Sequence, residues 1–475
     1  MLKLKMLKRA AALLSCTVLF GTVLFGCSTK EAASSANENS AVSEATESTA
    51  EESSQGEMKP DPYKPKCEVD ETVRNLGLCI TEWPEYMKSI RSIRQRLELY
   101  RETGFRSVRT GIEWRVIEPT EGTYTSSSAQ TYMLLAKQAG LRIKLGVGTI
   151  MGPPQWYFSK YPGSSMMNHD GVEAVATASY FAPDIMEYYE NAARVILQQM
   201  KDADLLDTID AVMLDCGPAG EPLYPAAWTQ QVDGLDNPTF NEMFWGYDKY
   251  SQENFRQTMK EKYGTIAAAN AAWGKSYSSF DQVEVPKPGG PGGGIWADYL
   301  YWYRDSKREF VVQQVEMYQK LLEEFSGGRI KLIMYIPGTD ITDEQFENAV
   351  NSGDGEGVVR VMSDNRFIID TAKKYGCWLQ YTGFENESQT KYLRKYMDES
   401  GAGDIPFFGE NAGQYDSVKN GGLMSAIVRM NGMAGLDITH SRYLFDNNTT
   451  EPCASYDQFK KHMNILINYL NPRDS

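Results

Sequence analysis

The 475-residue sequence predicts an α/β fold, a (β/α)8 TIM barrel with an insertion subdomain after the fourth strand. Two observations predict this class. Short β-rich runs alternate with longer stretches of helical periodicity, and about 400 residues are available for eight such units. The eight runs are 76–80, 107–113, 142–148, 211–215, 330–336, 378–381, 405–408 and 433–438.

Amphipathic stretches of helical length separate most of these runs. They cover 86–103, 127–139, 185–203 and 358–375. The segment from 215 to 330 is too long for a simple strand–helix unit, so it leaves room for the insertion, predicted at about 222–328. A doubly wound open sheet is the alternative arrangement of the same units.

The first residues have the composition of a targeting segment. Lys3, Lys5, Lys8 and Arg9 precede an apolar run, and the sequence up to Cys27 resembles the lipobox of bacterial lipoproteins. We therefore expect a lipoprotein signal peptide at 1–26, lipidation of Cys27, and anchoring to the outer face of a bacterial cell membrane. An ordinary signal peptide and an uncleaved anchor are the alternatives. Residues 27–60 are rich in Ser and Glu and predict a disordered tether, and 61–475 form the predicted catalytic domain.

Composition narrows the class of ligand. The net charge is −15, from 48 basic and 63 acidic side chains, which disfavours a nucleic-acid partner. With 28 Tyr, 9 Trp and 18 Phe but only 3 His, the chain favours a neutral ligand that stacks on rings over a histidine-built metal site. We expect no metal and no cofactor, and the oligomeric state stays open.

The cysteines are few for an exported chain. Cys79, Cys216 and Cys377 lie in apolar runs and are predicted to be buried thiols. Whether Cys67 and Cys453 form a disulfide is left open by the sequence.

Two glutamates follow predicted strands and carry the expected chemistry. Glu221 follows the fourth run and Glu410 the seventh, so on a barrel both face the mouth at the carboxyl ends of the strands. Glycosidic cleavage needs such a pair, one carboxyl protonated and the other ionised. The glycine-rich segment 217–221 lets a bulky ligand approach the backbone, and Tyr224 offers a flat face for a sugar ring.

At these residues the chain resembles a known family. Segment 215–225 is similar to the segment that holds the general acid of the β-amylases, glycoside hydrolase family 14, and 408–416 to the segment that holds their general base. Segments 375–385, 435–442 and 154–156 agree in order and spacing. The resemblance implies that Glu221 is the acid, that Glu410 is the base, and that Thr382 and Arg442 help to hold the sugar and the water. The substrate-binding residues predicted with them are Trp114, Trp156, Tyr224, Glu385 and Asn411.

Several of these residues have a structural alternative. Trp114 and Trp156 suit barrel packing as well as sugar stacking. Glu221 suits a surface loop, Glu410 a structural ion pair and Glu385 a solvated loop. Arg442 suits an ion pair with Glu410 or Asp446.

The chain also departs from the β-amylase pattern. Gly111 stands where β-amylases have an aspartate, and 146–153 replaces a histidine and a glycine-rich loop. In addition, 255–277 and 114–124 resemble segments of family 42 β-galactosidases. Together these features predict a glycoside hydrolase for oligo- or polysaccharides, inverting by the β-amylase pattern. A retaining, β-galactosidase-like hydrolase and a non-catalytic glycan-binding lipoprotein are the alternatives, and eight sequential units disfavour a two-lobed solute-binding protein.

Overall fold

The computed structural model describes residues 77–81, 90–148, 152–217, 220–225, 243–384, 386–411 and 434–438. The predicted signal peptide, tether and lipidation site Cys27 lie outside these ranges, as do Cys67, Cys453, Glu385 and Arg442. The three described cysteines, Cys79, Cys216 and Cys377, are free and buried, as predicted.

Eight parallel strands close into a barrel, which confirms the predicted fold class and excludes the open doubly wound sheet. Around the barrel the order is β1, β10, β9, β8, β7, β6, β3, β2. The strands are β1 (Leu78–Thr81), β2 (Ser107–Glu113), β3 (Arg142–Gly148), β6 (Ile209–Met213), β7 (Lys331–Ile336), β8 (Trp378–Tyr381), β9 (Phe407–Asn411) and β10 (Gly435–Ile438). All eight overlap the β-rich runs of the sequence.

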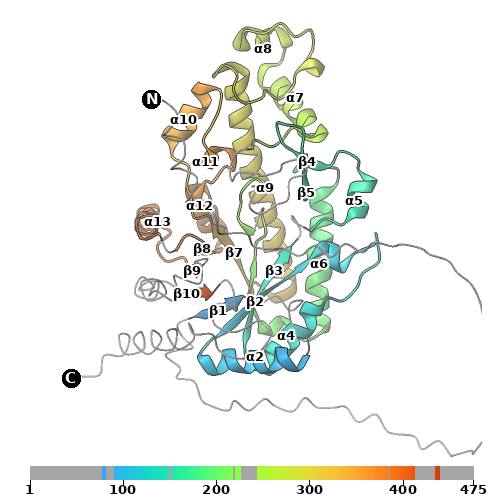
Figure 1. Cartoon of the computed structure of the whole chain (residues 1–475), viewed down its shortest axis with the longest axis vertical. Coiled ribbons are helices and arrows are strands. Elements are labelled where there is room, and N and C mark those ends of the chain that lie inside the picture. The colour runs from blue at the N-terminus through green and yellow to red at the C-terminus, as the bar shows by residue number, and fades with distance from the viewer. Residues whose placement is uncertain are drawn as a thin grey trace, which may run out of the picture. The chain divides into compact units, whose positions relative to one another are not determined.

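Helices surround the strands (Figure 1). Those of three or more turns are α2 (Ile90–Thr103), α4 (Ser128–Gln138), α6 (Ile185–Asp202), α9 (Gly294–Ser326), α12 (Asn365–Tyr375) and α13 (Glu387–Ser400). Shorter helices are α3 (Trp114–Ile117), α5 (Gln155–Lys160), α10 (Asp343–Ser352) and α11 (Gly357–Arg360). No helix in the described ranges has the length and apolarity needed to cross a membrane.

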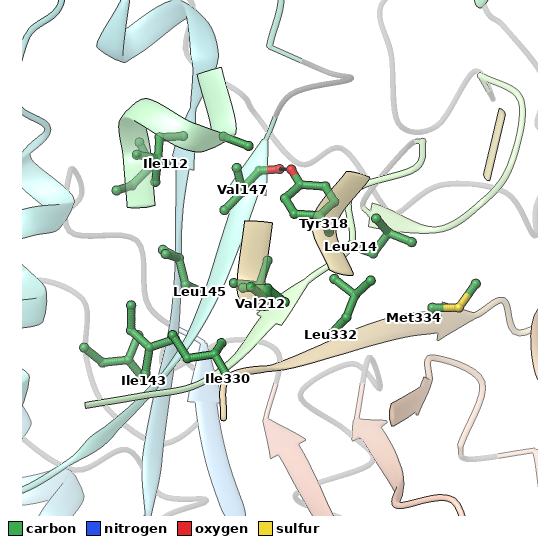
Figure 2. Close-up of a cluster of buried hydrophobic side chains, with 14 of the residues drawn as sticks. Ile112, Ile143, Leu145, Val147, Val212, Leu214, Tyr318, Ile330, Leu332 and Met334 are labelled. Carbon is green, nitrogen blue, oxygen red and sulfur yellow. Dashed lines mark hydrogen bonds between the residues drawn. The ribbon is translucent and has the colours of Figure 1, made fainter. Parts of the chain in front are cut away.

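The main core lies between the strands and this helical layer. Alternate strand residues point outward, and Figure 2 shows Ile143, Leu145 and Val147 of β3 beside Val212 of β6 in this cluster. Tyr318 of α9 closes the cluster and donates a hydrogen bond to the Val147 carbonyl over 3.4 Å. Because the pleat alternates, the intervening residues of the same strands point into the barrel.

The insertion after the fourth strand of the barrel has a hydrophobic core of its own. It contains α7 (Lys249–Tyr263), α8 (Ile266–Trp273) and a 3₁₀ turn at Phe280–Gln282, grouped beside the N-terminal half of α9 (Figure 1). Buried Asp298 of α9 joins them, since it accepts hydrogen bonds from Lys262 at 2.6 Å and from Tyr263 and Trp273 at 2.7 Å. The C-terminal half of α9 instead packs in the main core, so this helix contributes to both cores. The second core also includes side chains from β4, β5, α10 and α11.

The structure corrects the sequence analysis in two places. The helix predicted over 358–375 is two helices, α11 and α12, separated by Met362, whose φ is 53°. Asp364 then caps α12 by accepting from the Phe367 amide, which favours a new helix start over continuation. A hairpin of β4 (Ser165–Met167) and β5 (Glu173–Ala178), which was not predicted, follows α5.

Candidate active site

The interior of the barrel is charged on the side of β2, β3, β9 and β10. Arg109 of β2 and Lys144 of β3 are register partners, as are Glu410 of β9 and Asp437 of β10. Ion pairs join Arg109 to Glu410 and Lys144 to Asp437, although their strands are not adjacent. Only side chains that point into the barrel reach each other in this way.

Glu221 stands on a loop that begins after β6. A Cβ atom on Gly217 would lie 2.4 Å from the Leu223 carbonyl oxygen, and one on Gly220 would lie 2.6 Å from the Tyr335 ring. Gly220 also has a φ of +84°, which favours glycine. The glycines therefore let the loop fold tightly against the barrel and place Glu221 at its mouth.

The Glu221 carboxyl is set up to hold a proton at neutral pH. The residue is 6% exposed, and desolvation by burial raises its pKa to about 7. The Thr382 hydroxyl, which donates to Glu221 Oε1 over 2.5 Å, lowers the pKa in part, and the negative charge of Glu410 raises it. Burial has the largest effect, as it does for the raised general acids of glycosidases.

The Glu410 carboxylate is held by donors. Arg109 Nη1 donates to Glu410 Oε2 over 3.1 Å, and Gln380 Nε2 donates to the same oxygen over 2.6 Å. Glu410 is 6% exposed, so both contacts are largely shielded from solvent. A guanidinium and an amide N–H both stabilise the ionised form of a carboxyl group.

One strand brings the two glutamates together. Thr382, which contacts Glu221, directly follows the end of β8, and Gln380, which contacts Glu410, lies two residues before it on the same face. Residues two apart on a strand are separated by roughly 6.5–7 Å. The two carboxyl groups therefore border one site, the first with its pKa raised by burial and the second in contact with a guanidinium and an amide.

Thr382→Val tests the contact with Glu221. Loss of the hydroxyl is expected to raise the Glu221 pKa further, because the hydrogen bond favours the charged carboxylate. The alkaline limb of the pH–rate profile should then move up by about one unit, and kcat should fall about tenfold. Thr382→Ser keeps the hydroxyl and should resemble the wild type. An unmoved or lowered limb in Thr382→Val would contradict the assignment.

Two of the predicted sugar platforms are core residues, which corrects the sequence analysis. Trp114 is fully buried, donates its indole N–H to Glu118 and stacks on Tyr188. Tyr224 is 2% exposed, donates to the Tyr303 carbonyl and stacks on that ring at 3.9 Å. Neither ring is available to a sugar, because aromatic neighbours already cover its faces.

The remaining predicted binding residues have different positions. Trp156 is half-buried beside Trp114, with its indole N–H bonded to the Glu118 carbonyl. Thr382 lies in the site, where its hydroxyl contacts Glu221. Asn411 ends β9 directly after Glu410, and Glu385 and Arg442 lie outside the described residues.

The structure adds Arg109 and Tyr335 to the site, which sequence reasoning missed. Tyr335 is packed between the Gly220 backbone and the Arg109 guanidinium, which lies 5.1 Å from the ring centroid. The sequence did contain a signal for Arg109. Residues two apart on a strand share a face, so Arg109 lies on the same face as Gly111 and Glu113, which points into the barrel. Within the described part of the chain, no group of three or more His, Cys, Asp or Glu side chains is arranged to hold a metal ion.

Comparisons with known proteins find two families of glycoside hydrolases. The model of glycosyl hydrolase family 14 matches residues 182–382, which include Glu221 and Thr382. The family 42 model, described as beta-galactosidase, matches residues 81–213, which include Arg109. The chain resembles two glycoside hydrolase families. Glu221 and the Thr382 hydroxyl thus lie in the part that resembles family 14, and the Arg109 guanidinium lies in the part that resembles family 42.

Individual relatives show the same mixture. The chain is 25% identical over 251 residues to a beta-amylase of Niallia circulans, covering 47% of this chain and 41% of the relative. It is 27% identical over 215 residues to a beta-galactosidase of Arthrobacter sp, covering 43% of this chain and 27% of the relative. The matched region thus spans less than half the length of these relatives.

Solved structures share the fold. The catalytic domain of the beta-amylase of Paenibacillus polymyxa superposes with a TM-score of 0.66 at 18% identity, over 82% of this chain and 98% of that one. The beta-galactosidase of Marinomonas ef1 superposes with a TM-score of 0.56 at 15% identity, over 84% and 60%. At such low sequence identities the structural likeness shows only that the chain forms the same kind of barrel. The chemistry has to be inferred from the residues of the site.

Proposed function

We propose that this protein is a glycoside hydrolase that cleaves O-glycosidic bonds of oligo- or polysaccharides, with Glu221 as general acid and Glu410 as general base. One observation carries the proposal. Two buried glutamates border a single site at the carboxyl ends of the barrel strands, one with a pKa raised by burial and the other in contact with the Arg109 guanidinium. Families 14 and 42 support the reaction class.

The geometry assigns a step to each group. Glu221, protonated near pH 7, gives its proton to the glycosidic oxygen as the bond to the anomeric carbon breaks. Glu410, ionised beside Arg109, removes a proton from the water that attacks the anomeric carbon. The proton that Glu221 loses thus leaves with the released sugar, and the proton of the water passes to Glu410. Both carboxyl groups return to their starting states by exchange with solvent.

We propose an inverting stereochemical course, for which the match of the Glu221 segment to family 14 is the support. The alternative is a retaining course in which Glu410 attacks the anomeric carbon itself. The family 42 match, which contains Arg109, favours that alternative. Inverting pairs lie roughly 6.5–9.5 Å apart and retaining pairs about 5–5.5 Å.

Anomeric analysis distinguishes the two courses. The purified protein is incubated with a panel of α- and β-linked oligosaccharides, and proton NMR records the first product anomer before mutarotation. An anomer opposite to that of the substrate supports Glu410 as base, whereas the same anomer assigns it as nucleophile. Binding without turnover across the panel would contradict the hydrolase and favour a glycan-binding protein.

A further inference from the structure

A second buried acid lies next to Glu410. Asp437 of β10 is its register partner and is fully buried. Neighbouring strands of a sheet are about 4.8 Å apart, so two inward-pointing carboxylates at this position repel each other unless one is neutralised. Two adjacent acids therefore call for a second positive charge besides Arg109.

Lys144 supplies that charge. Its Nζ lies 2.8 Å from Asp437 Oδ1, with side-chain exposures of 5% and 0%. The same Nζ lies 4.1 Å from the centroid of the Phe408 ring, two residues before Glu410. Lys144 thus reaches across the barrel from β3, past β2 and β1, to the strands that carry the two acids.

Lys144 also contacts the amide that holds Glu410. Its Nζ lies 3.5 Å from Gln380 Oε1, while Gln380 Nε2 donates to Glu410 Oε2 over 2.6 Å. An ammonium group has donors only, so it favours the amide orientation whose oxygen faces Lys144. That orientation leaves the N–H₂ end for Glu410.

We propose that Lys144 is a positioning residue for Glu410, which neutralises the neighbouring Asp437 and fixes the Gln380 amide with its donor toward the base. This proposal rests on the function assigned to Glu410 above. Branched aliphatic residues usually fill a barrel interior, and a buried ion pair adds little net stability compared with them. The Lys144–Asp437 pair contacts Gln380, which holds Glu410. A role in the reaction therefore explains this buried pair better than a contribution to stability does.

Burial raises the pKa of the Cys79 thiol and of the Tyr335 phenol, which both face the pair, and Glu221 is protonated below about pH 7. Asp215 is a further acid of this interior, and its charge acts on Tyr335. In direct contact with one another are two cations, Arg109 and Lys144, and two anions, Glu410 and Asp437. Removing one member alone changes the field at Glu410.

Three variants test the proposal by pH–rate profiles of kcat and KM together with thermal unfolding. Lys144→Met should move the acidic limb up by about one pH unit and lower kcat at least tenfold with KM within about twofold, because Asp437 then repels the ionised base. Asp437→Asn should move the limb down, since both cations remain. Lys144→Met/Asp437→Asn should return the limb toward the wild-type position, because neither the repelling acid nor its partner remains.

A purely structural pair predicts a different pattern. The melting temperature would fall in the single variants while both limbs stayed in place, and that result would overturn the proposal. A double variant whose limb stayed with that of Lys144→Met would also overturn it. Lys144→Met leaves Asp437 buried without its cationic partner. If this variant fails to fold for that reason, Asp437→Asn and the double variant still test the proposal, because the proposal expects the acidic limb to move down in Asp437→Asn and to lie near the wild-type position in the double variant.

A readout without turnover separates this proposal from the function on which it rests. In protein labelled with δ-¹³C glutamate, the Glu410 carboxyl signal is assigned by its loss in Glu410→Gln and titrated in each variant. Shifts in the stated directions, in a protein without hydrolytic activity, would support the role of Lys144 and refute the hydrolase. Turnover in the wild type with an unmoved Glu410 titration would refute the role of Lys144 alone.

Discussion

Glu221→Gln is expected to lower kcat about 10³-fold while substrate binding stays within about twofold of the wild type. The amide has nearly the same shape as the carboxyl group but cannot give up a proton to the leaving oxygen. The loss should be much smaller for a glycosyl fluoride, whose leaving group needs little protonation. Initial rates on an oligosaccharide and on the fluoride, with calorimetric binding, measure both effects.

A carboxyl group of equal burial provides the control. Glu118 is 5% exposed and serves the fold through hydrogen bonds from Trp114 Nε1 and the Gly122 amide. Glu118→Gln should therefore affect stability and leave kcat near the wild-type value. Equal losses on the oligosaccharide and the fluoride in Glu221→Gln would contradict the acid role.

The raised pKa of Glu221 also affects folding. The folded protein holds this proton up to about pH 7, against an ordinary value of 4.5. The stability that accompanies proton binding is fully present below pH 4.5 and is lost as pH rises through 7, where the buried carboxylate must ionise. Glu221→Gln avoids this cost, so its free energy of unfolding relative to the wild type should rise by about 3 kcal/mol between pH 4.5 and 8. Urea unfolding at several pH values measures it.

Glu410→Gln should lower kcat about 10³-fold on every substrate, the glycosyl fluoride included. Whether this carboxylate activates water or attacks the sugar, a good leaving group does not replace it. This result would distinguish it from Glu221→Gln, whose loss depends on the leaving group. The variant should also lose stability, because Arg109 remains largely enclosed without the carboxylate that it contacts. Circular dichroism at the assay temperature ensures that the rates describe folded protein.

Asp210→Asn is the matched control for Glu410→Gln. Like Glu410, Asp210 is a strand carboxylate that pairs with an arginine, here one on the neighbouring strand, since Arg142 Nη2 lies 2.6 Å from Asp210 Oδ1. The pair lies at the start of β6 and β3, at the end of the barrel opposite the mouth. Its loss should lower the melting temperature slightly and leave kcat unchanged. Similar rate losses in both variants would mean that the effect is structural.

The positions of the eight strands could be predicted from sequence because each is a short β-rich run between stretches of helical period. The residues that interrupt a helix were harder to recognise. Met362 adopts a positive φ without being glycine, and the pattern of apolar residues continues across it from α11 into α12. The periodicity of apolar residues indicates which face of a segment is buried. It therefore does not reveal a break between two helices when the same face stays buried on both sides of the break.

For the site, the sequence by itself predicted the two glutamates as candidates, because a carboxylate near the carboxyl end of a parallel strand faces the mouth of the barrel whatever its partners are. Only the tertiary structure decided their surroundings. Burial raises the pKa of Glu221, and Glu410 contacts Arg109, which lies 301 residues away in the chain. The tertiary structure also decided that Trp114 and Tyr224 are core residues, because the rings that cover them come from other helices. Strand order and closure bring Arg109, Lys144 and Asp437 into one interior, and local sequence carries no record of which inward-pointing side chains meet there.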